Sequence, residues 1–268
     1  MGPEYTFHMG IRRLVVIGLL LAVVLSGAAI ARGEIAGDGD LFVSFSGGFT
    51  PRSLPRDRDV PVTVRLNTSI KTADGSRPPH LRRISFAVNR YGRISTRGLP
   101  ACRPGLLEST DPATALDRCR DALVGRGKFV ANVEFPNREP FPVHGQMLAF
   151  NGRVHGRPAI LLHIHGSQPI EVTVVLTFSI HHRPQGKFGT VLSTRIPRLA
   201  SDLGYVTDVS LVFNRTYTYH GERRSFLSAR CAAPAGFPGA IFSFTRGTFV
   251  FAGGKQIVTT LTRDCTVR

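Results

Sequence analysis

VTVRLNTSI, from Val62 to Ile70, recurs as VTVVLTFSI from Val172 to Ile180. Both copies alternate apolar or β-branched residues with polar ones, a pattern that predicts β-strands. Two further pairs of segments follow in the same order in each half: ISFAVNR (84–90) with VSLVFNR (209–215), and RGKFV (126–130) with RGTFV (246–250). This collinear similarity indicates an internal duplication, which describes architecture and assigns no activity.

Short strands of this kind recur along the whole chain and are separated by glycine, proline and asparagine. Asn151-Gly152, His220-Gly221 and Gly253-Gly254 mark hairpin turns, because glycine and asparagine tolerate the positive backbone angles that tight turns require. Antiparallel strands at roughly ten-residue intervals are typical of sandwich folds. We therefore expect a mainly β protein with an antiparallel β-sandwich architecture, Ig-like or jelly-roll-like.

One stretch, residues 112–124, predicts a short helix. Asp111 stands at the N-cap position, Pro112 at the first helical position and Gly125 just past the end, which is the expected punctuation of a helix. Cys119 lies on the apolar face of this helix and is expected to point into the core, where it would meet Cys102.

The duplication allows two domain arrangements. In the favoured one, a first β-sandwich repeat spans 32–150 and a second spans 151–268, because each half would hold its own disulfide. In the alternative, both halves form a single sandwich and each supplies one layer. No flexible linker separates the halves, so the interface between them is expected to be extensive.

The start of the chain has the features of a secretory signal peptide at residues 1–31. Arg12-Arg13 precede an unbroken apolar stretch from Leu14 to Leu25, and small residues follow up to Ala31. Cleavage near Ala31 would leave a secreted or extracytoplasmic protein of the cell envelope, with no further segment long enough to span a membrane. An uncleaved anchor is the alternative, since 18 residues from Leu14 to Ala31 approach the length that spans a bilayer.

Four cysteines make an even number in a chain expected to be exported, where thiols oxidise to disulfides. Four cysteines allow three pairings. The favoured one joins Cys102 to Cys119 and Cys231 to Cys265, because each pair lies within one half of the duplication. Each bridge would stabilise the fold by roughly 3 to 4 kcal/mol through restriction of the unfolded chain.

Several cysteine-containing stretches resemble a group of uncharacterised exported bacterial β-rich proteins. They are GLPAC (98–102), ALDRC (115–119), ALVGRG (122–127) and ARCAAP (229–234). The resemblance covers most of the mature chain and implies export and a shared scaffold. It implies no activity and no site residues.

The chain is strongly basic, with 34 Lys and Arg against 18 Asp and Glu. Residues 60–103 contain nine basic side chains and Asp74 as the sole acidic one. Candidate anion-binding residues in this segment are Arg82, Arg83, Arg90 and Arg93, with Tyr91 between them. The expected partners are anionic cell-wall polymer, polysaccharide or lipid headgroups, and nucleic acid is disfavoured outside the cell. The alternative is a solvated sheet face neutralised by counterions.

His163, His165 and Glu171 form a candidate metal site. Residues two apart in a strand share a face, so both imidazoles would project together, and two imidazoles with a carboxylate bind divalent transition metals. The set is similar to the first motif of the cupin metalloenzymes. The intervals from Gly156 to His163 and from His165 to Glu171 are longer than in that motif, and its second part is absent. A polar, solvent-facing strand is the alternative.

The sequence contains no GxSxG elbow, P-loop, HExxH pair or dinucleotide fingerprint. The favoured interpretation is a non-enzymatic, exported, disulfide-stabilised protein with a binding or structural role at the cell envelope and no cofactor. A cupin-like metal-dependent enzyme is the second hypothesis. The third is an extracellular assembly subunit whose sheet edges pair with neighbouring copies. The oligomeric state stays open.

Overall fold

The computed structural model describes residues 34–168, 171–197 and 204–268. These residues belong to one compact unit. The signal peptide expected at 1–31 lies outside the described residues.

The protein is mainly β, as expected. The strands up to the middle of the chain are β1 (Glu34–Asp38), β2 (Leu41–Thr50), β3 (Ser53–Leu54), β4 (Val60–Pro61), β5 (Thr63–Thr72), β6 (Leu81–Asn89), β7 (Gly92–Ile94), β8 (Leu123–Val133) and β9 (Phe141–Val154). Those that follow are β10 (Arg157–Gln168), β11 (Val172–Gln185), β12 (Phe188–Arg195), β13 (Gly204–Phe213), β14 (Thr216–Tyr219), β15 (Glu222–Ser225), β16 (Leu227–Ala229), β17 (Gly239–Phe251) and β18 (Gln256–Val267). The α-helix is α2 (Pro112–Cys119), and short 3-10 turns are η1 (Pro104–Leu106), η2 (Arg120–Ala122) and η4 (Ala252–Gly254).

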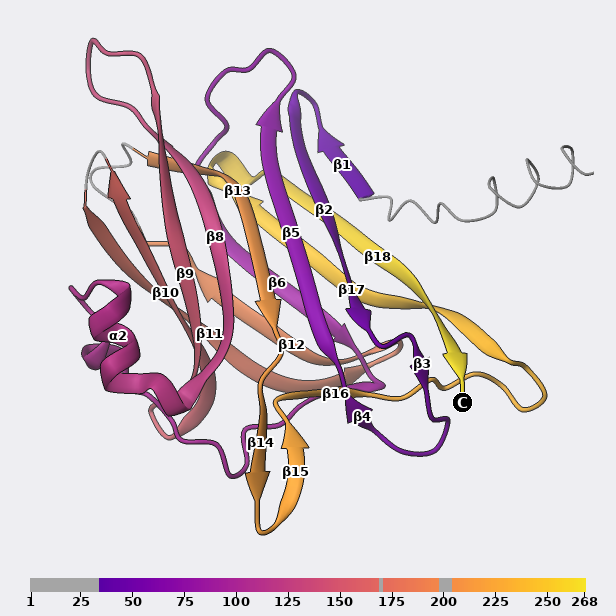
Figure 1. The fold of residues 1–268 in the computed structure, drawn as a ribbon. Coiled ribbons are helices and arrows are strands. Elements are labelled where there is room, and N and C mark those ends of the chain that lie inside the picture. Colours follow the sequence, from indigo (N-terminus) through magenta and orange to yellow (C-terminus); the bar gives the residue numbers. More distant parts are fainter. Residues whose placement is uncertain (1–33, 169–170, 198–203) are drawn as a thin grey trace, which may run out of the picture. The chain divides into compact units, whose positions relative to one another are not determined.

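Most strands belong to one 13-stranded sheet with the order β1-β2-β5-β13-β8-β9-β10-β11-β12-β6-β17-β18-β3. Neighbouring strands in this sheet are antiparallel except for β18 and β3, which pair in parallel. A three-stranded sheet has the order β4-β16-β7, and β14 and β15 form a separate hairpin. Figure 1 shows the large sheet curling around an interior, with the β14–β15 hairpin projecting at its lower end.

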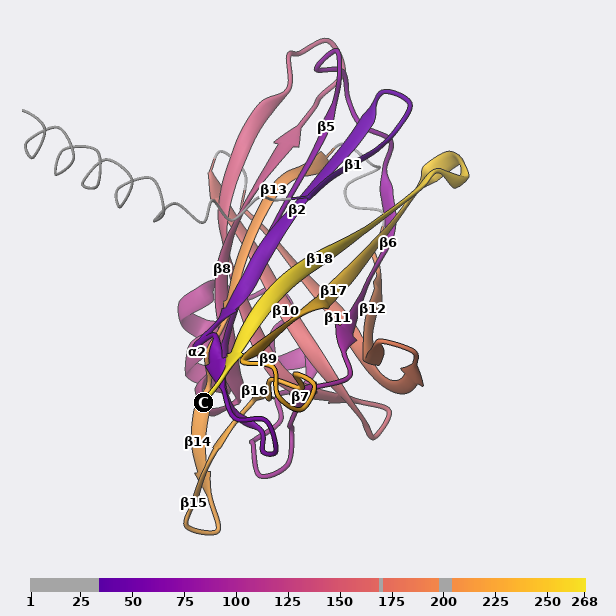
Figure 2. The same ribbon diagram turned by 90° about the vertical axis from the view of Figure 1, so that its right-hand side faces the viewer.

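The sheet curls until β18, near one end of the strand order, lies against β1 and β2 at the other end. Two hydrogen bonds join these strands. The backbone N–H of Thr262 donates to the Glu34 carboxylate over 3.2 Å, and Arg263 Nε donates to the Gly47 carbonyl over 2.6 Å. Figure 2 shows β18 beside β2 in a second view. The inner face of the sheet is therefore enclosed by the sheet itself.

Phenylalanines from four strands form the centre of the core. Phe45 of β2 is fully buried, and its ring centroid lies 5.6 Å from that of Phe86 in β6 and 6.1 Å from that of Phe249 in β17. Phe86 also contacts Phe178 of β11, with the centroids 6.3 Å apart. Strands that are distant in sequence are thus held together by aromatic packing.

The expected helix is present but shorter than predicted. Asp111 caps it by accepting a hydrogen bond from the Thr114 backbone N–H over 2.9 Å. The α-helix ends at Cys119 instead of continuing to residue 124, because Leu123 already pairs with Phe150 of β9 as the first residue of β8. Pairing across the sheet therefore overrides the local helical pattern.

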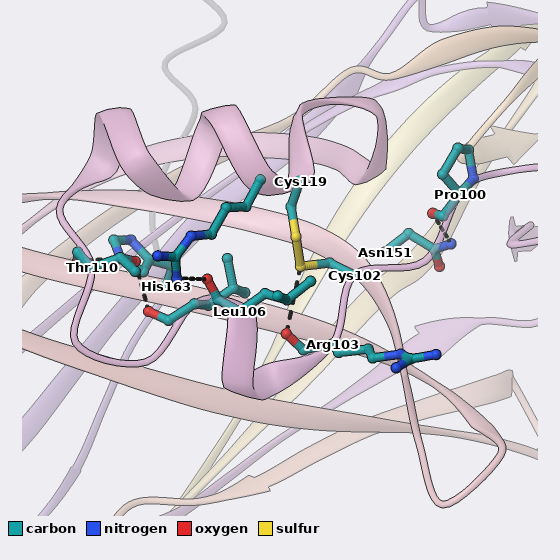
Figure 3. The surroundings of a disulfide bond; sticks show 10 residues. Pro100, Cys102, Arg103, Leu106, Thr110, Cys119, Asn151 and His163 are labelled. Carbon is teal, nitrogen blue, oxygen red and sulfur yellow. Dashed lines mark hydrogen bonds between the residues drawn. A yellow bond between two sulfur atoms is a disulfide. The ribbon is translucent and has the colours of Figure 1, made fainter.

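Both expected disulfides are confirmed, Cys102 with Cys119 and Cys231 with Cys265. In Figure 3 the first bridge joins the helix to the segment that precedes it. Together they cover the outer face of β9 and β10, where Leu148, Phe150 and Leu161 form a buried cluster with the helical segment.

The segments that resemble one another are interleaved in the large sheet. The similar segments ISFAVNR (84–90) and VSLVFNR (209–215) lie mostly in β6 and β13. Strand β13 of the second half is inserted between β5 and β8 of the first, while β6 of the first half lies between β12 and β17 of the second. Strands from both halves therefore share one sheet, and the expected boundary at residue 150 falls inside β9.

Replacing Phe45 by alanine is expected to lower the free energy of unfolding by about 3 to 5 kcal/mol, because the change removes a fully buried ring from the aromatic core. Phe42 lies on the outer face of the same strand and is 37% exposed, so Phe42→Ala is the matched control, with an expected loss of about 1 kcal/mol or less. Denaturant unfolding measures both. Equal losses for the two variants would contradict this description of the core.

Candidate functional site

The interior of the curled sheet contains a cavity of ≈ 330 Å³. Among the described residues, its wall is formed by inward-pointing side chains of nine strands, β5, β6, β8 to β13 and β17. Protein interiors normally have few voids larger than a water molecule, and small-molecule sites typically start at about 300 Å³. The cavity is therefore large enough to hold a small molecule.

The lining is almost entirely apolar. Toward its middle it is formed by leucine, isoleucine, valine and phenylalanine side chains, among them Leu66, Phe86, Ile164, Leu192 and Leu211. These five side chains point into the interior yet remain only half-buried. Burial of apolar surface contributes about 25 cal/mol of favourable free energy per Å². A bound apolar molecule would gain this free energy by covering these side chains.

A smaller cavity of ≈ 80 Å³ continues the apolar interior toward the three-stranded sheet. Phe86, Leu192 and Phe213 line both cavities. The small cavity is bounded on its other side by Ile94 of β7 and Leu227 of β16. The β4-β16-β7 sheet thus forms a floor at this end of the interior, and Figure 1 places β16 beside the β14–β15 hairpin.

The opposite end of the large cavity is its mouth. Val172 lines the cavity there and is 41% exposed. Tyr205 also lines it, and the Tyr205 hydroxyl accepts a hydrogen bond from Asn132 Nδ2 over 3.1 Å. His80 and Arg82 are the basic residues of the lining, and none of its described residues is acidic. The cavity therefore combines an apolar interior with two basic residues at its mouth.

The arginines predicted to bind anions do not form a single surface. Arg82 lines the cavity mouth, whereas Arg83 points to the outer face of β6 and is exposed, because neighbouring strand residues face opposite sides. Arg90 and Arg93 lie beyond the other end of β6, roughly 20 to 30 Å along the strand direction. There the guanidinium of Arg90 lies over the Tyr91 ring, 5.1 Å from its centroid.

His163 and His165 share the outer face of β10, as predicted, with parallel rings 6.2 Å apart. His163 Nε2 donates to the Thr110 carbonyl over 2.8 Å, and His165 Nδ1 lies 3.0 Å from the Thr173 hydroxyl. That hydroxyl donates to the same Thr110 carbonyl over 2.8 Å. The two histidines are buried and hold the helical segment against the sheet, and Figure 3 shows His163 beside Thr110 of that segment.

Glu171 lies farther from this pair. Its Oε1 is 3.9 Å from His165 Nε2, and its side chain is 74% exposed. Over the described ranges, no group of three or more His, Cys, Asp or Glu side chains is arranged to hold a metal ion. The contacts of His163 and His165 instead explain their burial through hydrogen bonds to threonine.

Comparison of the chain with protein-family models, with curated proteins and with solved structures finds no match. Within the part of the chain that the structure describes, no helix has the length and hydropathy needed to cross a membrane.

The cavity was not predicted from the sequence, although the sequence contains one indication of it in the inward positions of the strands. The inward positions of the strands with similar sequences are mostly apolar, but alternation shows only which face of a strand is apolar. Whether the enclosed space is filled depends on how far the sheet curls, which no local pattern specifies.

Acidification is expected to destabilise the protein through His163. Burial, followed by repulsion from His165, holds the pKa of His163 below its usual value, although the Thr110 hydrogen bond partly opposes this. His163 Nδ1 has no hydrogen-bond partner among the described residues. The unfolded chain therefore protonates His163 more readily than the folded chain does. The stabilisation that comes from neutral His163 is fully present well above pH 6.5. It is lost as the pH falls below about 6.5, by at most about 1.4 kcal/mol per pH unit.

Denaturant unfolding between pH 7.5 and pH 5 tests this, with His163→Gln expected to show a shallower decline than the unmodified protein. His155 lies exposed in a turn, and the control His155→Asn is expected to leave the decline unchanged. An identical pH dependence for His163→Gln and the unmodified protein would rule out His163 as the source.

Proposed function

We propose that this protein is a non-enzymatic binding protein that holds a lipid-like molecule in the cavity of its curled sheet. The observation that carries the proposal is the apolar, ≈ 330 Å³ cavity, several of whose inward side chains are left half-buried. A molecule with an apolar chain would cover these side chains and gain the free energy of their burial.

The duplicated sequence supports this proposal. Equivalent positions of the matched segments line the same cavity: Leu66 with Leu176, Ile84 with Val209, Phe86 with Leu211, and Phe129 with Phe249. We infer that an internal duplication supplied both sides of the cavity wall. The similarity noted in the sequence would then reflect a shared task, lining the site.

The shape and lining of the cavity favour one class of occupant. The floor formed by β4, β16 and β7 limits the depth of the apolar interior, which suits a small molecule better than a folded partner. At the mouth, His80 and Arg82 add polar groups to the lining, which suits a ligand with a polar end. The proposed ligand is an amphiphile with an apolar chain and a polar head.

The proposal places the protein outside the cytoplasm, at the cell envelope. Its support is the pair of disulfides, since disulfides form and persist in oxidising compartments. An exported carrier of this kind would keep an apolar molecule out of water between membranes or wall layers.

A cavity-filling variant tests the function. Val174 of β11 lines the cavity, and Val174→Trp is expected to weaken binding of 11-(dansylamino)undecanoic acid at least about ten-fold, which corresponds to about 1.4 kcal/mol. The rise in dansyl fluorescence on transfer to an apolar site measures binding.

The control is Val258→Trp, since Val258 is 46% exposed and lies outside the lining. This variant is expected to bind as tightly as the unmodified protein. Binding that is absent from all three proteins, or equally strong in all three, would contradict an internal site.

A further inference from the structure

A second hollow lies beyond the floor of the apolar interior. It is a groove of ≈ 670 Å³ whose lining comes from β7, β15, β16 and the β11–β12 hairpin. Gly92, Ile94 and Ser228 line this groove as well as the small apolar cavity, so the floor strands separate the groove from the interior.

The groove is strongly basic. Arg90, Arg93, Arg223 and Arg224 line it, and Asp59 is the one acidic residue among the described residues of its lining. The arginines come from two segments more than 120 residues apart in sequence, at β6–β7 and at β15. Folding thus places positive charge from separate strands around one hollow.

Contacts with neighbouring groups hold two arginines on the β6–β7 side in place. Arg90 donates to the Tyr91 hydroxyl over 3.1 Å and to the Gly186 carbonyl over 3.4 Å. The guanidinium of Arg230 lies over the same Tyr91 ring, 5.4 Å from its centroid.

Arg93 forms an ion pair with Asp59. A guanidinium that is already fixed loses less conformational entropy when it binds an anion.

The β15 side of the groove contributes a second pair, Arg223 and Arg224. Arg224 lies over the Tyr219 ring and bonds to Glu222 over 2.8 Å. Arg223 is exposed. Ser228 and Thr190 line the same groove, and the Thr190 hydroxyl lies 3.2 Å from His182 Nδ1.

We propose that this groove binds a phosphate-containing polymer, with phosphate groups held between the Arg90 and Arg223 sides. Arginine forks match phosphate oxygens in pairs, and several arginines around one hollow suit a ligand with more than one negative charge. The site goes beyond the proposed lipid-like ligand and occupies the other side of the floor.

A soluble polymer fits the groove better than a membrane surface. The large apolar side chains most exposed on the described surface are Ile35, Phe42, Leu106, Val172, Phe237, Ile241 and Val258. None of them lines the groove. Attachment to a lipid bilayer usually combines basic groups with inserted apolar side chains, and the groove offers the basic groups alone.

Calorimetric titration with short-chain inorganic polyphosphate tests the site. Arg90→Gln/Arg223→Gln is expected to weaken binding about 100-fold, since a hydrogen bond to a charged group typically contributes about ten-fold or more in affinity. The affinity of the unmodified protein is expected to fall steeply with added salt.

The matched control is Arg65→Gln/Arg126→Gln, which removes the same charge from exposed positions on β5 and β8 outside the groove. It is expected to change the affinity by less than about three-fold. Equal weakening in both double variants would show diffuse charge attraction and overturn the site, as would binding to phosphatidylglycerol vesicles without binding to polyphosphate. Dansyl-fatty-acid binding by Arg90→Gln/Arg223→Gln is expected to be unchanged, which separates this site from the cavity.

Discussion

The apolar inner face of the large sheet must be shielded from water, and the structure depends on how this is done. No second layer covers the face in the described chain. The sheet instead curls until β18 meets β1 and β2, and the hydrogen bonds from Thr262 to Glu34 and from Arg263 to Gly47 join the two sides. Aromatic contacts among Phe45, Phe86 and Phe249 hold the curled strands together from within.

Curling on this scale has a consequence for function. A sheet of this many strands encloses more space than its own side chains fill, so a cavity remains and apolar side chains stay half-buried. One end of the interior is closed by β4, β16 and β7, and two basic residues, His80 and Arg82, line the other. The cavity thus results from the closure of the sheet. The outer face of the sheet packs against the helical segment, which His163 and the Cys102–Cys119 bridge hold in place.

Local sequence patterns were sufficient for much of the fold. The strands, the Asp111 cap and both disulfides follow from alternation, helix punctuation and cysteine position. The exchange of β6 and β13 between the halves was beyond such reasoning, because strand pairing depends on contacts between segments more than 100 residues apart. The same limit applies to the sites: Arg90 and Arg93 were identified from the sequence, but Arg223 and Arg224 join them only in the folded chain.

We propose that the curled sheet holds one amphiphile inside it. Native mass spectrometry of the protein mixed with laurate tests this most directly, because it counts bound molecules on the folded chain. A single laurate per chain is expected, displaced by dansyl-undecanoate and much reduced in Val174→Trp. A spectrum with no bound laurate, or with a graded series of adducts that Val174→Trp leaves unchanged, would contradict it.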